Sequence, residues 1–157
     1  MNEYKNQRYN DFMKPVANKL KEKYPSVIGH IDMDKILFVS VDGTAPKIDD
    51  HVFGAADLFK GVKVSKMPLA LTEIIYQESE HCYFWKIEFK SWLFDRYGCN
   101  VITSLLYHCL RCISTKGTIM APDRFGWSEL MEHLPSNWYD PDASDCPDIL
   151  EDNILQG

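Results

Sequence analysis

Apolar residues recur at every fourth position between Tyr9 and Tyr24, a spacing that predicts an amphipathic helix. The stripe consists of Phe12, Val16, Leu20 and Tyr24. Pro15 falls near the first turn of this predicted helix, where a missing N–H costs little. We therefore expect a helix that packs one face on a core.

Two later stretches have strand character. The apolar run from Ile36 to Val41 is followed by Asp42-Gly43, as in a buried strand that ends in a turn. Residues 44–61 are loop-like, and a second strand is predicted around Leu71 to Gln77. The aromatic-rich stretch from His81 to Tyr97 fits a helix or a strand, because its periodicity supports both.

The pattern after Gly98 is helical. Asn100 is the predicted N-cap, and the apolar spacing continues to a stop near Gly117. A last helix is predicted from Trp127 to Leu134. This order of helices and strands predicts an α+β domain with a small sheet.

Negative charge is concentrated at the C-terminal end, within an overall net charge of -6. Six of the 23 acidic residues lie there with no basic residue among them, which leaves 17 to balance 17 Lys and Arg in the body. That balance argues against a body that binds nucleic acid through a broad positive field. We divide the chain into one domain, residues 1–139, and an acidic tail, residues 140–157. The tail is expected either to be solvated or to meet a basic surface on a partner.

Composition predicts a folded cytosolic protein. The chain of 157 residues suits one compact domain, and no apolar run approaches the length of a membrane span. In the cytosol the five cysteines are expected to be reduced, as core residues, thiols or metal ligands.

One turn of the predicted helix after Gly98 carries the candidate chemistry. His108 and Cys112 are four residues apart, which places imidazole and thiol on the same face. Both groups bind zinc, and the spacing is the one that zinc-peptidase helices use for two histidines. The other interpretation is a core histidine beside a buried cysteine.

The general base of a hydrolytic zinc site is missing from this turn. The residue after the first ligand, normally a glutamate, is Cys109, and no carboxylate occurs between Asn100 and Met120. The chain also lacks a glycine-rich phosphate loop, a nucleophile elbow and paired CxxC motifs. Hydrolysis by the usual zinc route is therefore not expected.

The order of segments resembles the metallopeptidases encoded by bacteriophages and prophages, a small zincin-like family. LLYHCLRCI stands where that family has a helix carrying HELLH, and PDRFGWSELMEHLPSNW matches its last segment through Trp127 and Trp138. The family also has an N-terminal helix followed by a strand that resembles the stretch SVIGHIDMDKILFV. The resemblance therefore extends from about Tyr9 to Trp138.

The resemblance implies a zincin-like domain in which a short sheet packs on the helix with the degenerate metal motif. His108 matches the first ligand, whereas Cys109 replaces the catalytic glutamate and Cys112 the second histidine. Pro122 replaces the third ligand, before Asp123. Zinc is then implied as a structural ion, held by His108, Cys112 and a new ligand such as Cys146.

A phage relative without its catalytic base is expected to act by binding a protein in the host cytoplasm. The specific expectation is an inhibitor of a host defence nuclease, of the anti-CRISPR type, whose acidic end competes for a basic nucleic-acid channel. The alternatives are an active zinc hydrolase with unconventional His/Cys ligation and a phage structural or assembly protein. The expected partner-binding residues are Asp140, Asp142, Asp145, Asp148, Glu151 and Asp152.

Overall fold

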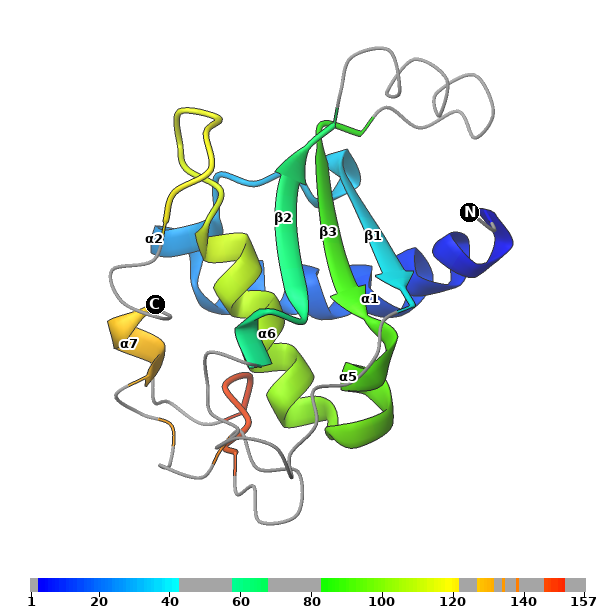
Figure 1. Cartoon of the computed structure of the whole chain (residues 1–157). Coiled ribbons are helices and arrows are strands. Elements are labelled where there is room, and N and C mark those ends of the chain that lie inside the picture. The colour runs from blue at the N-terminus through cyan, green and yellow to red at the C-terminus, as the bar shows by residue number, and fades with distance from the viewer. Residues whose placement is uncertain are drawn as a thin grey trace.

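A long helix, α1 (Glu3–Lys23), crosses behind a small sheet in Figure 1. The computed structural model describes residues 3–42, 58–67, 83–121, 127–131, 134, 138 and 146–151. The predicted N-terminal helix is confirmed, but it begins earlier, so Pro15 lies in its interior and not in its first turn. Pro15 cannot donate the intrahelical hydrogen bond expected there, and burial of the core face of α1 offsets that loss.

The core face of α1 differs from the predicted stripe. Phe12 is 55% exposed, and the buried residues of the helix and its end are Met13, Ala17, Leu20 and Tyr24. A strict spacing of four drifts around a helix of 3.6 residues per turn, whereas steps of four, three and four stay on one side. The buried face of α1 therefore follows the spacing of four, three and four residues.

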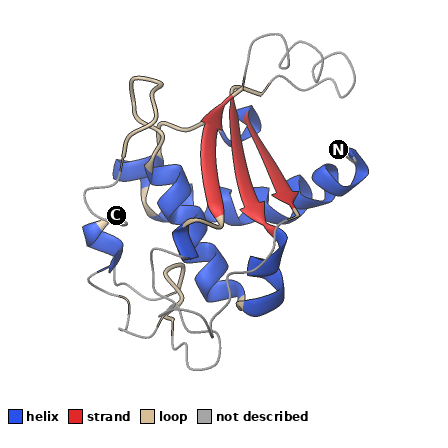
Figure 2. Ribbon diagram, in the orientation of Figure 1, coloured by secondary structure: helices blue, strands red, loops and turns tan. Residues whose placement is uncertain are grey.

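The sheet contains three strands, β1 (Ile36–Val41), β2 (Val62–Lys66) and β3 (Trp85–Lys90), in the order β1-β3-β2. β1 pairs with β3 in parallel, and β2 pairs with β3 antiparallel. The α+β class is thus confirmed, with a mixed sheet. Figure 2 shows these strands in red as a single layer against the helices.

The strand at residues 36–41 is confirmed, and β2 begins directly after the stretch predicted as loop. The predicted strand around Leu71 to Gln77 lies outside the described residues. The aromatic-rich stretch, left open between helix and strand, contains both: β3 leads directly into the short helix α5 (Ser91–Arg96).

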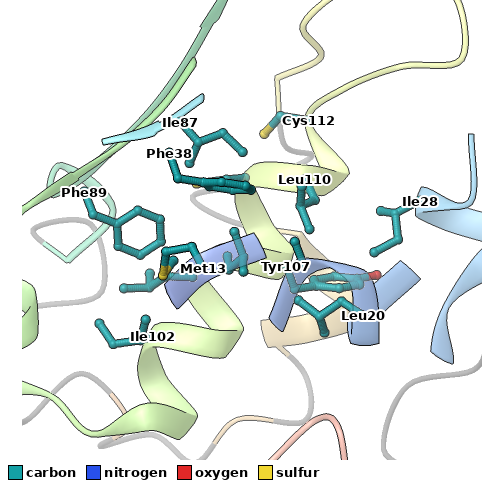
Figure 3. Close-up of a cluster of buried hydrophobic side chains, with 14 of the residues drawn as sticks. Met13, Leu20, Ile28, Phe38, Ile87, Phe89, Ile102, Tyr107, Leu110 and Cys112 are labelled. Carbon is teal, nitrogen blue, oxygen red and sulfur yellow. The ribbon is translucent and has the colours of Figure 1, made fainter. Parts of the chain in front are cut away.

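The main core lies between one face of the sheet and the helices α1 and α6 (Cys99–Arg111). Alternate strand residues such as Phe38 and Ile87 point into it, as period-two alternation requires. Figure 3 shows these side chains gathered with Met13 of α1 and Tyr107 of α6. The opposite sheet face carries a smaller apolar cluster, composed of Leu37, Val39, Met67 and Tyr83.

Short helices complete the described fold: α2 (Pro25–Ile28), the 3-10 helix η1 (Met33–Lys35) and α7 (Ser128–Met131). α7 confirms the start of the predicted last helix within one residue. Residues 132 and 133 lie outside the described residues, and Leu134, the predicted end, is not helical.

Both predicted ends of α6 are wrong. Gly98 is the N-cap, and Asn100 lies inside the helix, where its side-chain amide donates to the carbonyl of Cys146. The helix ends at Arg111, six residues before Gly117, because a tight turn begins at Ser114. The Ser114 hydroxyl accepts hydrogen bonds from the backbone N–H groups of Lys116 and Thr118, and this local bonding competes with helix. Gly117 supports the turn with a φ of 75°.

Candidate functional site

The helix that carries the His-Cys turn is enclosed along most of its length. Every residue from Val101 to Leu110 is buried, including the polar side chains of Thr103, Ser104 and His108. A helix with one solvent face would show a period near 3.6 in its burial, and α6 does not. The described part of α6 is therefore a central core helix.

The His108 imidazole lies in an aromatic environment. It is 8% exposed, and its ring centroid is 4.4 Å from that of Phe59, whose ring in turn lies 5.6 Å from Trp138. Its buried Nδ1 has no hydrogen-bond partner among the described residues. Burial lowers the pKa of His108 to about 4, since the charged form loses its hydration. The imidazole is therefore neutral near pH 7.

The Cys112 thiol points back along the helix. Its Sγ donates to the backbone oxygen of His108 at 3.3 Å. Burial raises the pKa of this thiol, so without a metal the sulfur is protonated and acts as a hydrogen-bond donor. His108 and Cys112 thus lie one turn apart as predicted, but they are connected through a thiol–carbonyl contact.

Cys109 occupies the position of a peptidase's general base, and it is a core residue. Its exposed fraction is 0%, and burial raises its pKa well above the ordinary value. A group that cannot reach water cannot take a proton from a metal-bound water. The structure thus gives Cys109 a packing role.

Cys146 lies against an earlier turn of α6 than the turn that carries His108. Its Sγ is 3.7 Å from the Ser104 hydroxyl, and its carbonyl accepts from the Asn100 amide at 3.1 Å. No three His, Cys, Asp or Glu side chains within the described ranges are placed to hold one ion, so His108, Cys112 and Cys146 do not form such a group. Zinc stays a prediction from the resemblance.

The acidic end is attached to the body through residues 146–151, here called the C-terminal segment. Ile149 is 0% exposed and belongs to the main core. The Tyr24 hydroxyl donates to its carbonyl, and the Lys23 ammonium donates to the carbonyl of Leu150 at 2.6 Å. With the Asn100 bond to Cys146, three side chains hold the segment by its main chain: Lys23 at the end of α1, Tyr24 just after it, and Asn100 of α6.

Two of the six predicted partner-binding carboxylates lie in this segment. Glu151 is exposed, and Asp148 is half-buried with its Oδ1 accepting from the backbone N–H of Leu150 at 3.0 Å. Asp140, Asp142, Asp145 and Asp152 lie outside the described residues. The segment therefore inserts Ile149 inward while Glu151 faces solvent.

Sequence reasoning missed the residues that attach this segment. One signal was present: Ile149-Leu150 is an apolar pair inside an otherwise acidic stretch, as expected where a tail contacts a core. The donors Lys23, Tyr24 and Asn100 gave no such signal, because their bonds join residues far apart in the chain.

A polar cluster that the sequence did not reveal joins α6 to α7. Glu129 accepts from the Tyr107 hydroxyl at 3.2 Å and from Nε of Arg111 at 3.0 Å. The Arg111 guanidinium also lies 4.4 Å from the Trp127 ring centroid. Burial, together with the Glu129 carboxylate, raises the pKa of Tyr107, so this phenol stays protonated. The cluster fixes α7 on the core helix.

Comparison with known proteins adds no relative: no family model matches the chain, and no curated protein or solved structure matches it. Among the described helices, none combines the length and the apolar character needed to cross a bilayer.

Proposed function

We propose that this chain is a non-catalytic, zincin-related phage protein that binds a host protein through its acidic C-terminal end. The proposed partner is a defence nuclease whose nucleic-acid channel is basic, so that the carboxylates compete with phosphates for it. This proposal combines the family resemblance of the sequence with the charge and attachment of the C-terminal segment.

The attachment of the C-terminal segment is the observation that carries the proposal. Three of its hydrogen bonds to the body use backbone carbonyls, those of Cys146, Ile149 and Leu150. The carboxylate of Glu151 remains exposed, and Asp148 is half-buried. A rigidly held set of charges binds a complementary surface at lower entropic cost than a free tail.

The burial of α6 supports a role without hydrolysis. The turn that resembles a metal-binding helix is enclosed by aromatic and aliphatic side chains, and Cys109 is fully buried. A zinc hydrolase needs an open coordination position for water and a base beside it. No three His, Cys, Asp or Glu side chains of the described residues are placed to hold one ion there, and α6 itself carries no carboxylate.

Charge neutralisation tests the proposal without unfolding the segment. In the double variant Asp148→Asn/Glu151→Gln the net charge rises by two. The control Glu22→Gln/Asp95→Asn makes the same change at two exposed carboxylates of the body. Truncation is unsuitable, because it would also remove buried Ile149.

The readout is inhibition of DNA cleavage by a panel of RNA-guided nucleases from the host, with binding measured at two salt concentrations. We expect inhibition by the wild type and about tenfold weaker binding of the Asp148/Glu151 variant at low salt, mainly through a slower association rate. Equal losses in both variants, or no inhibition of any nuclease in the panel, would contradict the proposal.

A further inference from the structure

Two thiols line one open pocket at the start of α6. The pocket has a volume of about 290 Å³ and is formed by residues 96–101 and Cys146. Cys99, the first residue of the helix, is exposed, and Cys146 of the C-terminal segment is half-buried. Both carry the reduced thiol, and small molecules in solvent reach the pocket that they share.

The hydrogen bonds around the pocket place Cys146 against the beginning of α6. The Asn100 amide, one residue after Cys99, is 3.1 Å from the carbonyl of Cys146. The Ser104 hydroxyl, one turn further, is 3.7 Å from its Sγ. Cys146 is therefore held against the first two turns of α6, beside the turn that Cys99 begins.

Local geometry gives both cysteines room to approach. Gly98 precedes Cys99 with no atom within 4 Å of the position where a Cβ would stand, so the start of the helix is uncrowded. The described hydrogen bonds of the C-terminal segment with Asn100, Tyr24 and Lys23 use its carbonyls and not the thiol of Cys146. A disulfide requires Cβ atoms about 4 Å apart, so a bond between Cys99 and Cys146 requires the two residues to reach that separation across the pocket.

We propose that Cys99 and Cys146 form a reversible disulfide that fastens the C-terminal segment to the N-terminus of α6 under oxidising conditions. The oxidant is a low-molecular-weight disulfide. Exposed Cys99 attacks it as the thiolate and releases one small thiol. Cys146 then attacks the Cys99 sulfur and releases the second. Two protein thiols and one small disulfide thus give one protein disulfide and two small thiols, with two electrons leaving the protein.

The buried cysteines are excluded from this exchange by access. Cys109 and Cys112 are buried in the core, so a small disulfide does not reach them in the folded protein. Among the described cysteines, Cys99 and Cys146 are the pair that line one solvent-accessible pocket. In a reducing cytosol such a bond is transient, which suits a response to oxidative stress.

Peptide mapping of the full chain after equilibration with oxidised and reduced glutathione tests the inference. Trypsin releases Cys99 in residues 97–111 and Cys146 in residues 125–157. We expect these two peptides to be joined, with a mass about 2 units below their sum, and to separate on reduction. Because residues 97–111 also contain Cys109, fragmentation and the control Cys109→Ala assign the sulfur; the control should keep the link.

The variants Cys99→Ser and Cys146→Ser should each lose the joined peptide and carry a single glutathione adduct on the remaining cysteine. Oxidation should raise the melting temperature of the wild type and leave that of Cys99→Ser unchanged. Separate glutathione adducts on Cys99 and Cys146 in the wild type, or a link from Cys146 to a different cysteine, would overturn the inference. The wild-type map decides the matter even if a variant fails to fold.

Discussion

The indole Nε1 of Trp127 donates a hydrogen bond of 3.1 Å to the backbone oxygen of His108, near the C-terminal end of α6. The last carbonyls of a helix lack intrahelical donors. The backbone N–H of Cys112 turns to the carbonyls of Cys109 and Leu110, so the His108 carbonyl depends on the indole and on the Cys112 thiol. Trp127 thus completes the end of the core helix from a distant part of the chain.

Replacing Trp127 by Phe keeps a buried ring and removes the indole N–H. We expect a loss of about 1–2 kcal/mol in the free energy of unfolding, measured by urea denaturation, because a buried carbonyl loses its stronger donor. Combined with Cys112→Ala, the loss should exceed the sum of the two single effects, since no side chain then serves the His108 carbonyl. Additive effects would show that the two donors act independently.

The buried imidazole of His108 predicts a specific dependence of stability on pH. Its pKa of about 4 lies below its ordinary value of 6.5. The unfolded chain therefore binds more protons between these pH values, and stability falls as pH falls through this window. Above pH 6.5 His108 is neutral in both the folded and the unfolded chain, so no stability is lost through its protonation.

The comparison variant is His108→Phe, which retains an aromatic ring beside Phe59 and cannot titrate. The difference in unfolding free energy between this variant and the wild type should change by about 2 kcal/mol, in favour of the variant, from about pH 7.5 to about pH 5. Urea denaturation at each pH measures it. A pH-independent difference would mean that His108 retains its ordinary pKa in the folded protein.

Ile149 attaches the C-terminal segment to the core. Ile149→Ala should lower the free energy of unfolding by about 2–4 kcal/mol, because a fully buried side chain leaves a cavity. The neighbouring Leu150 is half-buried, so Leu150→Ala serves as the matched control with a smaller expected loss. Similar losses in the two variants would contradict the buried position of Ile149.

Pro15 costs α1 one hydrogen bond in its interior. The side chain is exposed, so Pro15→Ala removes no core contact and restores an N–H at that position. We expect the free energy of unfolding, measured by thermal or chemical denaturation, to rise by about 1–3 kcal/mol. Asn18→Ala, at another exposed position of the helix, controls for the helix propensity of alanine. On the scale of helix propensities its free energy of unfolding should rise by less than about 1 kcal/mol.

Zinc should leave the stability unchanged if the described surroundings of His108 are its complete environment. No three His, Cys, Asp or Glu side chains of the described residues are placed to hold one ion, and Cys146 lies beside Ser104. Melting temperatures with added zinc and after chelation should agree, and elemental analysis should find no stoichiometric metal. A zinc-dependent rise in the wild type that is lost in Cys112→Ala would restore the metal-site hypothesis.

Local patterns in the sequence predicted the elements whose signals are local. The apolar run at residues 36–41 and the helical spacing after Gly98 correspond to β1 and α6. The ends of α6 were mispredicted because Asn100, a good N-cap by type, bonds to the distant Cys146 carbonyl instead. Its C-terminal end depends on the Ser114 turn, which spacing rules do not detect.

The candidate site was predictable in composition but not in orientation. Spacing placed His108 and Cys112 on one face of a helix, which the structure retains. It could not show that this face is enclosed, because burial depends on Phe59, Trp127 and Trp138 from other parts of the chain. The apolar pair Ile149-Leu150 indicated a contact with the core, but not which residues it meets, because those residues are remote in sequence.

The hydrogen bonds to the backbone carbonyls of the C-terminal segment, donated by Asn100, Tyr24 and Lys23, have an evolutionary consequence. Every amino acid has a backbone carbonyl, so these hydrogen bonds do not depend on which exposed side chains the segment carries. Position 151, which is exposed, is therefore free to vary, whereas Asp148 also accepts a hydrogen bond from the N–H of Leu150 and position 149 has to stay apolar. Single substitutions at the exposed position can thus alter the outward surface of the segment while its attachment to the core is kept.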